Sequence, residues 1–345
     1  MRVGLITGKQ ELELREFPSP VAEAGKAVVD ISGCGICGTD VHAYVHGDPY
    51  TPAICGHEWA GTVSACGAGV DNVREGDRVG VGISPACGNC PLCLVGAPAQ
   101  CMAALSEMLG RDPLAPPHGG FASSIAINAA RLYPLRPEIG DTEAALLEPA
   151  TVVTHALQRT PIRDGESVVV LGAGPIGLLA LQLAKAAGAG CVGVIEPDES
   201  RAALARSLGA TEVFAPDLED LESQLRNLCG KAGPDMVLEC AGVPSTIQRS
   251  VDLVRRGGRV GLVGLASTPA TILPGAWLVK EVTLTASLGY TNEEFDITQN
   301  LAAEGQVQLA PLVTDTVGLD SLDDALTQLM KPSGQIKILV DPNRD

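Results

Sequence analysis

The spacing of apolar and polar residues changes about 150 residues into the chain. Before that point, short β-type runs such as residues 27–33, 60–66 and 77–83 alternate with turns rich in Gly and Pro. We interpret this part as a compact, mostly-β domain. From about Glu143 the apolar spacing becomes helical, and residues 167–196 then follow the pattern of a buried strand, a helix and a second strand. This pattern predicts a β-α-β unit.

Strand and helix patterns continue to alternate through residues 235–265 and 282–289. The alternation predicts a doubly wound parallel sheet over residues 152–289, which makes the protein an α/β protein. The last apolar run, residues 334–341, has no obvious partner strand in that sheet. We therefore expect a first domain made of residues 1–151 and 290–345, with the second domain inserted into it.

Bulk composition narrows the class of protein. A length of 345 residues suits two domains, and 46% apolar content can fill both cores. The net charge of -17 argues against a nucleic-acid partner, because such binding depends on clustered Lys and Arg. The sequence has no signal-peptide pattern and no run of about 18 apolar residues. We expect a cytoplasmic protein with no membrane partner.

A glycine-rich loop joins the first strand of the β-α-β unit to its helix. Its pattern GxGxxG comprises Gly172, Gly174, Pro175, Ile176 and Gly177. Glycines at these places let the backbone turn, approach a pyrophosphate and pack the helix on the strand. The helix N-terminus behind the loop favours anions. Because the loop has the correct strand and helix on either side, it predicts a dinucleotide site.

Glu196 ends the next strand, nineteen residues after Gly177. A carboxylate at that place can accept hydrogen bonds from the adenosine ribose hydroxyls. It would also repel the 2'-phosphate of NADP, so the sequence favours NAD. Arg201 lies close enough to reach the same region and weakens that preference.

Four of the eleven cysteines form the pattern C-x2-C-x2-C-x7-C within a lobe of about residues 85–103. Four thiolates at this spacing can enclose one tetrahedral zinc and leave no open position for a substrate. We therefore expect a structural zinc; an iron–sulfur site is the alternative. The six other cysteines lie among apolar neighbours and are interpreted as core residues. The four expected zinc ligands are Cys87, Cys90, Cys93 and Cys101.

Two further motifs precede the lobe: GICGTD, which contains Cys37, and GHE, which contains His57 and Glu58. The order and spacing of these two motifs, the four-cysteine lobe and the glycine loop resemble the zinc-containing medium-chain dehydrogenase family. The resemblance extends from near Val3 to the C-terminus. It implies a GroES-like mostly-β catalytic domain and a Rossmann domain that binds the nucleotide.

The resemblance also assigns metal ligands. Cys37 and His57 match the family's catalytic zinc ligands, and Glu58 matches the carboxylate that binds the resting metal. Glu148 matches the third ligand, a position that is a Glu in many polyol, butanediol and threonine dehydrogenases of the family. The resemblance thus implies two zinc ions per chain.

Zinc at such a site lowers the pKa of a bound oxygen to about 7, which makes an alcohol easier to oxidise. Thr39 offers a hydroxyl near the ligand Cys37, and His42 is the expected end of a proton path. We interpret His46, His118 and His155 as surface-loop histidines. The segment HGGFA, which begins at His118, departs from the family's DGGFAEY because Ser123 and Ser124 replace its last two residues.

The resulting hypothesis is a zinc-dependent oxidoreductase that transfers a hydride from a secondary alcohol or polyol to NAD and yields the ketone. A threonine dehydrogenase and a vicinal-diol dehydrogenase are the alternatives within this chemistry. A zinc-free quinone reductase or a non-catalytic protein on the same fold would lack motifs that are present here. Residues 44–52 are expected to border the substrate pocket. The strand at residues 282–289 matches where relatives pair across a dimer, so we expect a homodimer or homotetramer.

Overall fold

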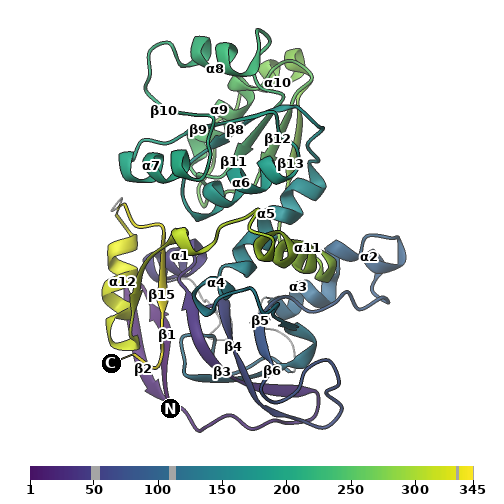
Figure 1. Ribbon diagram of the computed structural model, residues 1–345, viewed down its shortest axis with the longest axis vertical. Coiled ribbons are helices and arrows are strands. Elements are labelled where there is room, and N and C mark those ends of the chain that lie inside the picture. Colours follow the sequence, from purple (N-terminus) through teal and green to yellow (C-terminus); the bar gives the residue numbers. More distant parts are fainter. Residues whose placement is uncertain (48–54, 109–113, 332–333, 345) are drawn as a thin grey trace. The chain divides into compact units, whose positions relative to one another are not determined.

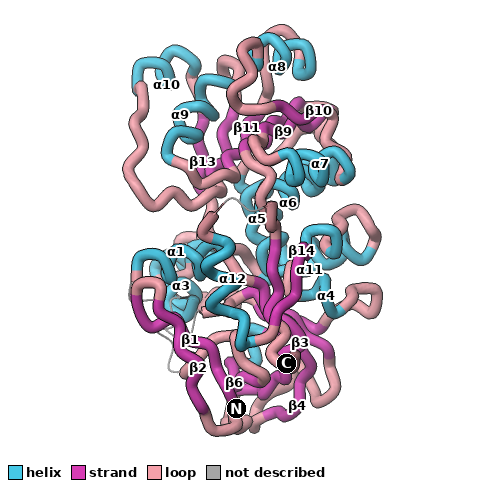
Figure 2. The backbone as a smooth tube through the Cα atoms, turned by 90° about the vertical axis from the view of Figure 1, so that its left-hand side faces the viewer, coloured by secondary structure: helices cyan, strands magenta, loops and turns pink. Residues whose placement is uncertain are grey.

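The computed structural model describes residues 1–47, 55–108, 114–331 and 334–344. The chain divides into two compact units (Figure 1). Unit 1 consists of Met1–Glu148, Tyr290–Ala303 and Leu309–Asp345, and unit 2 consists of Pro149–Gly289 and Glu304–Gln308. The C-terminal segment therefore folds back into unit 1, and both chain ends belong to that unit (Figure 2).

Unit 1 is built on a seven-stranded sheet with the order β14-β15-β3-β4-β5-β7, in which β6 also pairs with β3. All its pairs are antiparallel except the parallel pair β14–β15. A separate antiparallel hairpin joins β1 and β2. The strands are β1 (Arg2–Gly8), β2 (Glu11–Glu16), β3 (Lys26–Gly35), β4 (Glu58–Cys66), β5 (Arg78–Val81), β6 (Ser124–Asn128), β7 (Leu132–Pro134), β14 (Val313–Val317) and β15 (Lys337–Val340).

The helices of unit 1 are mostly short. Among its described residues, four connections are single turns of 3-10 helix, at Pro98–Gln100, Ala129–Arg131, Ala310–Leu312 and Leu319–Ser321. The α-helices are α1 (Gly38–His46), α2 (Pro91–Leu94), α3 (Met102–Met108), α4 (Asp141–Ala144), α11 (Asn292–Ala303) and α12 (Leu322–Leu329). Helix α5 (Leu147–Arg159) contains the boundary between the units, which falls after Glu148.

The C-terminal strand extends the sheet of unit 1 because its side chains are suited to a core position. All four residues of β15 are buried, and β15 pairs with β3 through Leu339 opposite Gly35. On the other side of β3, Gly35 lies opposite Glu58, the first residue of β4. This register brings the first residue of β15 and the start of β4 to the same end of the sheet.

Unit 2 is a six-stranded parallel sheet with the order β10-β9-β8-β11-β12-β13 (Figure 1). This order is the doubly wound arrangement in which the chain reverses direction beside the first strand. Its central strands β8 and β11 are wholly buried, as expected for parallel strands covered on both faces. The strands are β8 (Ser167–Leu171), β9 (Cys191–Ile195), β10 (Glu212–Phe214), β11 (Met236–Glu239), β12 (Arg259–Leu262) and β13 (Thr283–Ala286).

Five further helices connect the strands of unit 2. They are α6 (Pro175–Ala186), α7 (Glu199–Ser207), α8 (Leu221–Cys229), α9 (Pro244–Leu253) and α10 (Pro274–Lys280). Within the described part of the chain, no helix combines the length and the apolar character needed to span a bilayer. The GroES-like and Rossmann fold class expected from the sequence is confirmed by this architecture together with the comparisons given below.

Candidate metal and nucleotide sites

Three of the expected catalytic ligands meet at one end of the unit 1 sheet. Cys37 is the residue before α1, and His57 and Glu58 lie at the start of β4. The sulfur of Cys37, a ring nitrogen of His57 and a carboxylate oxygen of Glu58 all lie within 4.8 Å of one another. Thiolate, imidazole and carboxylate are the donors that zinc binds in catalytic sites. The donor set present therefore fits a zinc ion.

A buried carboxylate that the sequence analysis did not single out ties the two ligand-bearing loops together. Asp40 is fully buried and accepts hydrogen bonds from the backbone N–H groups of Cys37 (2.8 Å) and Gly56 (3.1 Å). Its Oδ1 also lies 4.0 Å from Nδ1 of His57. A carboxylate beside a ligand histidine fixes the orientation of the ring. The only sequence signal for this role was the Asp of GICGTD.

Glu148 lies beside this group rather than within it. Its side chain is half-buried in the first turn of α5, and the three-residue set above does not include it. Burial raises the pKa of Glu148 to about 7, and the charge of Glu58 adds to that effect, while His57 and the Tyr290 hydroxyl oppose it. The Glu148 carboxylate therefore interacts electrostatically with His57 and Glu58, although it is not part of the donor cluster.

Thr39 and His42 lie on α1, three residues apart, and so share a face of the helix. The Thr39 hydroxyl is 3.5 Å from the sulfur of Cys37. Among the described residues, Nε2 of His42 is buried and has no hydrogen-bond partner. The ring of His42 stacks on that of His46 with a centroid distance of 4.1 Å. The structure thus places both residues on the helix that directly follows Cys37.

The other histidines differ from the sequence-based expectation. His46 is exposed, as expected, but it is the last residue of α1 rather than part of a loop. His118 and His155 are buried, so the prediction of a surface position was wrong for both. His118 packs edge-on against Phe17, and burial lowers the pKa of its imidazole. Of the expected pocket border at residues 44–52, residues 48–52 lie outside the described part of the chain.

The four-cysteine lobe forms a second set of metal donors. The sulfurs of Cys87, Cys90, Cys93 and Cys101 lie within 4.8 Å of one another. The backbone N–H groups of Cys93 and Met102 donate to Cys90 and lower its pKa to about 6. The N–H of Cys87 donates to the sulfur of Cys101 at 3.3 Å. Since a metal binds thiolate rather than thiol, this backbone arrangement fits a structural zinc.

The glycine loop of unit 2 has the geometry that a pyrophosphate site requires. Gly172 has φ of 91°, a left-handed conformation that favours glycine. A Cβ on Gly177 would lie only 1.9 Å from the carbonyl oxygen of Gly172, so no side chain fits there. A Cβ on Gly174 would meet nothing within 4 Å, which leaves space in front of the N-terminus of α6. Pro175 and Ile176 form the first turn of that helix.

Glu196 already takes part in the glycine loop. One of its carboxylate oxygens accepts a hydrogen bond from the N–H of Ala173 (2.6 Å) and the other from the N–H of Asp198 (2.9 Å). Each carboxylate oxygen has two lone pairs, so the group can still accept from a ribose hydroxyl. Arg201 lies in the first turn of α7 and its backbone N–H donates to Asp198 at 3.0 Å. The carboxylate therefore helps to shape the loop through two backbone hydrogen bonds.

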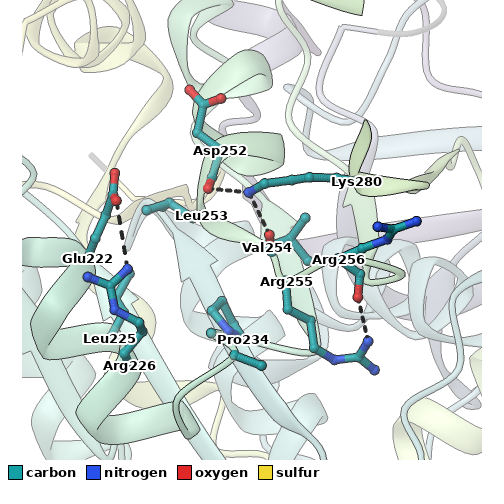
Figure 3. A pocket seen from close by; sticks show the side chains of 12 residues that line it. Glu222, Leu225, Arg226, Pro234, Asp252, Leu253, Val254, Arg255, Arg256 and Lys280 are labelled. Atoms are coloured by element: carbon teal, nitrogen blue, oxygen red, sulfur yellow. Dashed lines mark hydrogen bonds and ion pairs between the residues drawn. The ribbon is translucent and has the colours of Figure 1, made fainter. Parts of the chain in front are cut away.

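A separate pocket of about 340 Å³ opens in unit 2 beside the end of α9 (Figure 3). Its basic side chains are already engaged. Lys280 donates to the carbonyl oxygens of residues 251, 252 and 254, which end helix α9. Arg255 pairs with Asp235 at 2.7 Å, and Arg226 approaches Glu222 at 4.0 Å. We interpret these contacts as a structural closure of the helix end rather than a ligand site.

Comparison with known proteins agrees with this arrangement. A family model described as an alcohol dehydrogenase GroES-like domain matches residues 23–137, and one described as a zinc-binding dehydrogenase matches residues 175–304. Sorbitol dehydrogenase of Bacillus subtilis (strain 168) is 30% identical over 351 residues, which cover 100% of this chain and 98% of that protein.

Two similar solved structures contain nicotinamide cofactors. One is a putative zinc-binding dehydrogenase from Sinorhizobium meliloti 1021 bound to NADP, with a TM-score of 0.86, 28% identity and 99% of each chain covered. The other is described as a short chain alcohol dehydrogenase from Escherichia coli CFT073 in complex with NADH, with a TM-score of 0.86, 26% identity and 99% of each chain covered.

A GroES-like unit with clustered Cys, His and Glu donors, joined to a doubly wound nucleotide unit, defines a metal-dependent dehydrogenase. The matches place it more narrowly: the chain belongs to the zinc-dependent medium-chain alcohol and polyol dehydrogenase family. Zinc and a nicotinamide cofactor are accordingly its cofactors.

Replacing Cys90 with Ser is expected to remove about one zinc per chain, because a hydroxyl is a much weaker zinc ligand than a thiolate. The lobe should then unfold locally and the melting temperature should fall. Metal analysis and a thermal melt on the same sample measure both effects. The matched control is Cys191→Ser, a half-buried cysteine of unit 2 outside both donor sets. Unchanged zinc content in Cys90→Ser would show that the lobe holds no metal.

Proposed function

We propose that this protein transfers a hydride from the carbinol carbon of a secondary alcohol or polyol to NAD, which yields the ketone and NADH. The observation that carries this proposal is the convergence of Cys37, His57 and Glu58 at the end of a GroES-like unit. It is supported by a glycine loop shaped for a dinucleotide in the same chain. It is also supported by the full-length similarity to a sorbitol dehydrogenase.

Cys37, His57 and Glu58 would hold the catalytic zinc, with Glu148 of α5 as the further carboxylate ligand. When bound, the ion supplies a Lewis acid that makes an alcohol easier to deprotonate, and the nicotinamide ring supplies the hydride acceptor. The four thiols of the lobe would hold a second, structural zinc. The chain would then bind two zinc ions.

Oxidation of an alcohol also releases a proton from its oxygen, and residues of α1 can receive it. The Thr39 hydroxyl can donate its hydrogen to one group and, at the same time, accept a hydrogen bond from another. His42, on the same face of the helix, has a buried Nε2 without a protein partner in the described chain, so this atom can take up the proton. Thr39 would orient the substrate oxygen, and His42 would hold the proton.

The proposed preference for NAD rests on the charge of Glu196. The carboxylate is anchored by two backbone N–H groups, so it cannot easily move away from an incoming 2'-phosphate. Asp198, two residues later, adds a second negative charge at the N-terminus of α7. The phosphate of NADP would therefore be placed among anions.

The decisive experiment measures NADH absorbance while the purified protein is offered NAD with polyols, vicinal diols, L-threonine and simple secondary alcohols. We expect turnover of hydroxylated substrates of one class. Cys37→Ser should lower kcat/KM by at least about 1,000-fold with the fold intact, because the metal loses a ligand. The control is Cys66→Ser, a half-buried cysteine outside both donor sets. Full activity in Cys37→Ser would contradict the proposed metal site.

Replacing Glu196 with Gln removes the charge and keeps one oxygen that can accept from the N–H of Ala173, while the hydrogen bond from the N–H of Asp198 is lost. We expect the KM for NAD to rise about 10-fold and the KM for NADP to fall, since hydrogen bonds to a charged group contribute roughly 1.5–3 kcal/mol. Steady-state kinetics with both cofactors measures the ratio of the KM for NAD to the KM for NADP. The matched control is Glu199→Gln, an exposed carboxylate nearby on α7. Equal changes for the two cofactors would argue against recognition of the ribose.

We also propose that the chain forms a homodimer or a tetramer of two dimers through β13. This strand is the edge of the unit 2 sheet, so one side of it has free backbone groups. Several large apolar side chains near it are more than half exposed, an unusual arrangement for a strongly acidic protein. They are Leu273, Leu278, Val279 and Leu288.

Light scattering on a sizing column is expected to give two or four times the mass of 35.5 kDa. Leu278→Glu should shift the protein toward the monomer, because a carboxylate would have to be buried between the copies. Val21→Glu is the matched control, since Val21 is 72% exposed and lies in unit 1. A native protein that elutes as a monomer would refute the proposed assembly.

A further inference from the structure

A wholly buried carboxylate ends β11, a central strand of the unit 2 sheet. Oε1 of this residue, Glu239, accepts hydrogen bonds from the backbone N–H groups of Ala241 and Gly242, each at 3.0 Å. The hydroxyl of Thr246, in the first turn of α9, lies 2.7 Å from the same oxygen and 2.5 Å from the carbonyl oxygen of Val243, so it can donate to either. The sequence analysis did not single out Glu239.

The second carboxylate oxygen of Glu239, Oε2, is buried and has no hydrogen-bond partner in the part of the chain that the structure describes. A buried acceptor without a partner lowers stability, and proteins keep such features chiefly where function requires them. What the side chain contributes is the pair of backbone hydrogen bonds through Oε1. These bonds fix residues 240–242, which we call the β11 turn.

The β11 turn is packed between two other loops of unit 2. On one side, a Cβ on Gly172 would lie 3.1 Å from the Cα of Ala241, so the turn contacts the glycine loop. On the other side, a Cβ on Gly264 would lie 2.6 Å from Oε2 of Glu239 and closer still to the backbone nitrogen of Gly242. The N–H of Gly264 also donates to the carbonyl oxygen of Glu239 at 2.8 Å. Glu239 therefore fixes the turn against both of its neighbours.

The strand order of unit 2 places the β11 turn on one side of the glycine loop and Glu196 on the other. Strand β9, which ends just before Glu196, and strand β11 flank the first strand β8 on opposite sides. In a doubly wound sheet, each half of the sheet binds one half of a dinucleotide, across the point where the strand order reverses. Glu196 is on the side expected for the adenosine, so the nicotinamide half is expected beside the β11 turn.

We propose that Glu239 is a positioning residue for the nicotinamide half of the cofactor. It acts as a hydrogen-bond acceptor that holds the β11 turn in place, and the turn forms one wall of the nicotinamide site. Because the acceptor oxygen rather than the charge holds the turn, an uncharged acceptor of the same length should replace it. The inference rests on the nicotinamide cofactor of the family, and it is independent of the proposed substrate and of the proposed preference for NAD.

The test compares the binding of NADH with the binding of AMP, which occupies only the adenosine half of the site. Dissociation constants are measured without substrate, by NADH fluorescence and by displacement of NADH with AMP. Glu239→Met should weaken NADH binding by about 10-fold or more and AMP binding by less than about 2-fold, because only the nicotinamide wall is lost. Glu239→Gln keeps the acceptor oxygen and should bind NADH within about 3-fold of the native protein.

The matched control is Ser250→Ala, because Ser250 is a buried residue of the same helix α9 whose hydroxyl donates to the carbonyl oxygen of Thr246 at 2.8 Å. This control should lower the melting temperature and leave both dissociation constants within about 2-fold of the native values. If Glu239→Met does not fold, Gly264→Ala decides. Its Cβ would displace the β11 turn from the other side, and it should weaken NADH binding by about 5-fold or more with AMP binding unchanged.

Equal weakening of NADH and AMP binding in Glu239→Met would show that the residue only stabilises unit 2, and the proposal would be overturned. Unchanged NADH binding in Glu239→Met, or a loss in Glu239→Gln as large as the loss in Glu239→Met, would overturn it as well. In these cases the proposed hydride transfer stands. A native protein that binds neither NADH nor NADPH would instead refute the proposed function together with the role of Glu239. If the native protein binds only NADPH, the same comparison uses NADPH and adenosine 2',5'-bisphosphate.

Discussion

The register between β15, β3 and β4 is the constraint on which the proposed chemistry depends. It brings Lys337, from the end of the chain, and Glu58, from the first third of the chain, into contact at the same end of one sheet. Around that contact, Asp40 joins the loop of Cys37 to the loop of His57 through two backbone hydrogen bonds. A metal site with several anionic donors is tolerated in a protein interior only when its charges and hydrogen bonds are balanced in this way.

Unit 2 favours a negatively charged ligand mainly through its backbone. Its glycine loop leaves open space in front of a helix N-terminus, where backbone N–H groups and the helix dipole favour a pyrophosphate. Glu196 tightens the loop by accepting the N–H of Ala173 and also places a negative charge near the expected ribose position. One side chain can therefore contribute to loop shape and to cofactor choice.

The two proposed zinc sites differ in how the protein prepares their donors. In the lobe, backbone N–H groups donate to the sulfurs of Cys90 and Cys101, which favours thiolates within a short stretch of loop. At the proposed catalytic site the donors come from the residue before α1, from the start of β4 and, for Glu148, from the first turn of α5. The first arrangement is local and suits a structural ion. The second depends on tertiary contacts, which suits a site that must leave a coordination position open.

Local sequence determined much of this protein. The spacing of Cys87, Cys90, Cys93 and Cys101 defines a lobe because four thiols within fifteen residues can meet without help from distant strands. The glycine loop could also be predicted, since the left-handed backbone of Gly172 and the close approach at Gly177 favour glycine. Tertiary structure alone decided the burial of His118 and His155 and the pairing of Lys337 with Glu58. Periodicity indicates which residues form a strand, but it does not specify the neighbouring strand or its register, and these determine which charges meet in the interior.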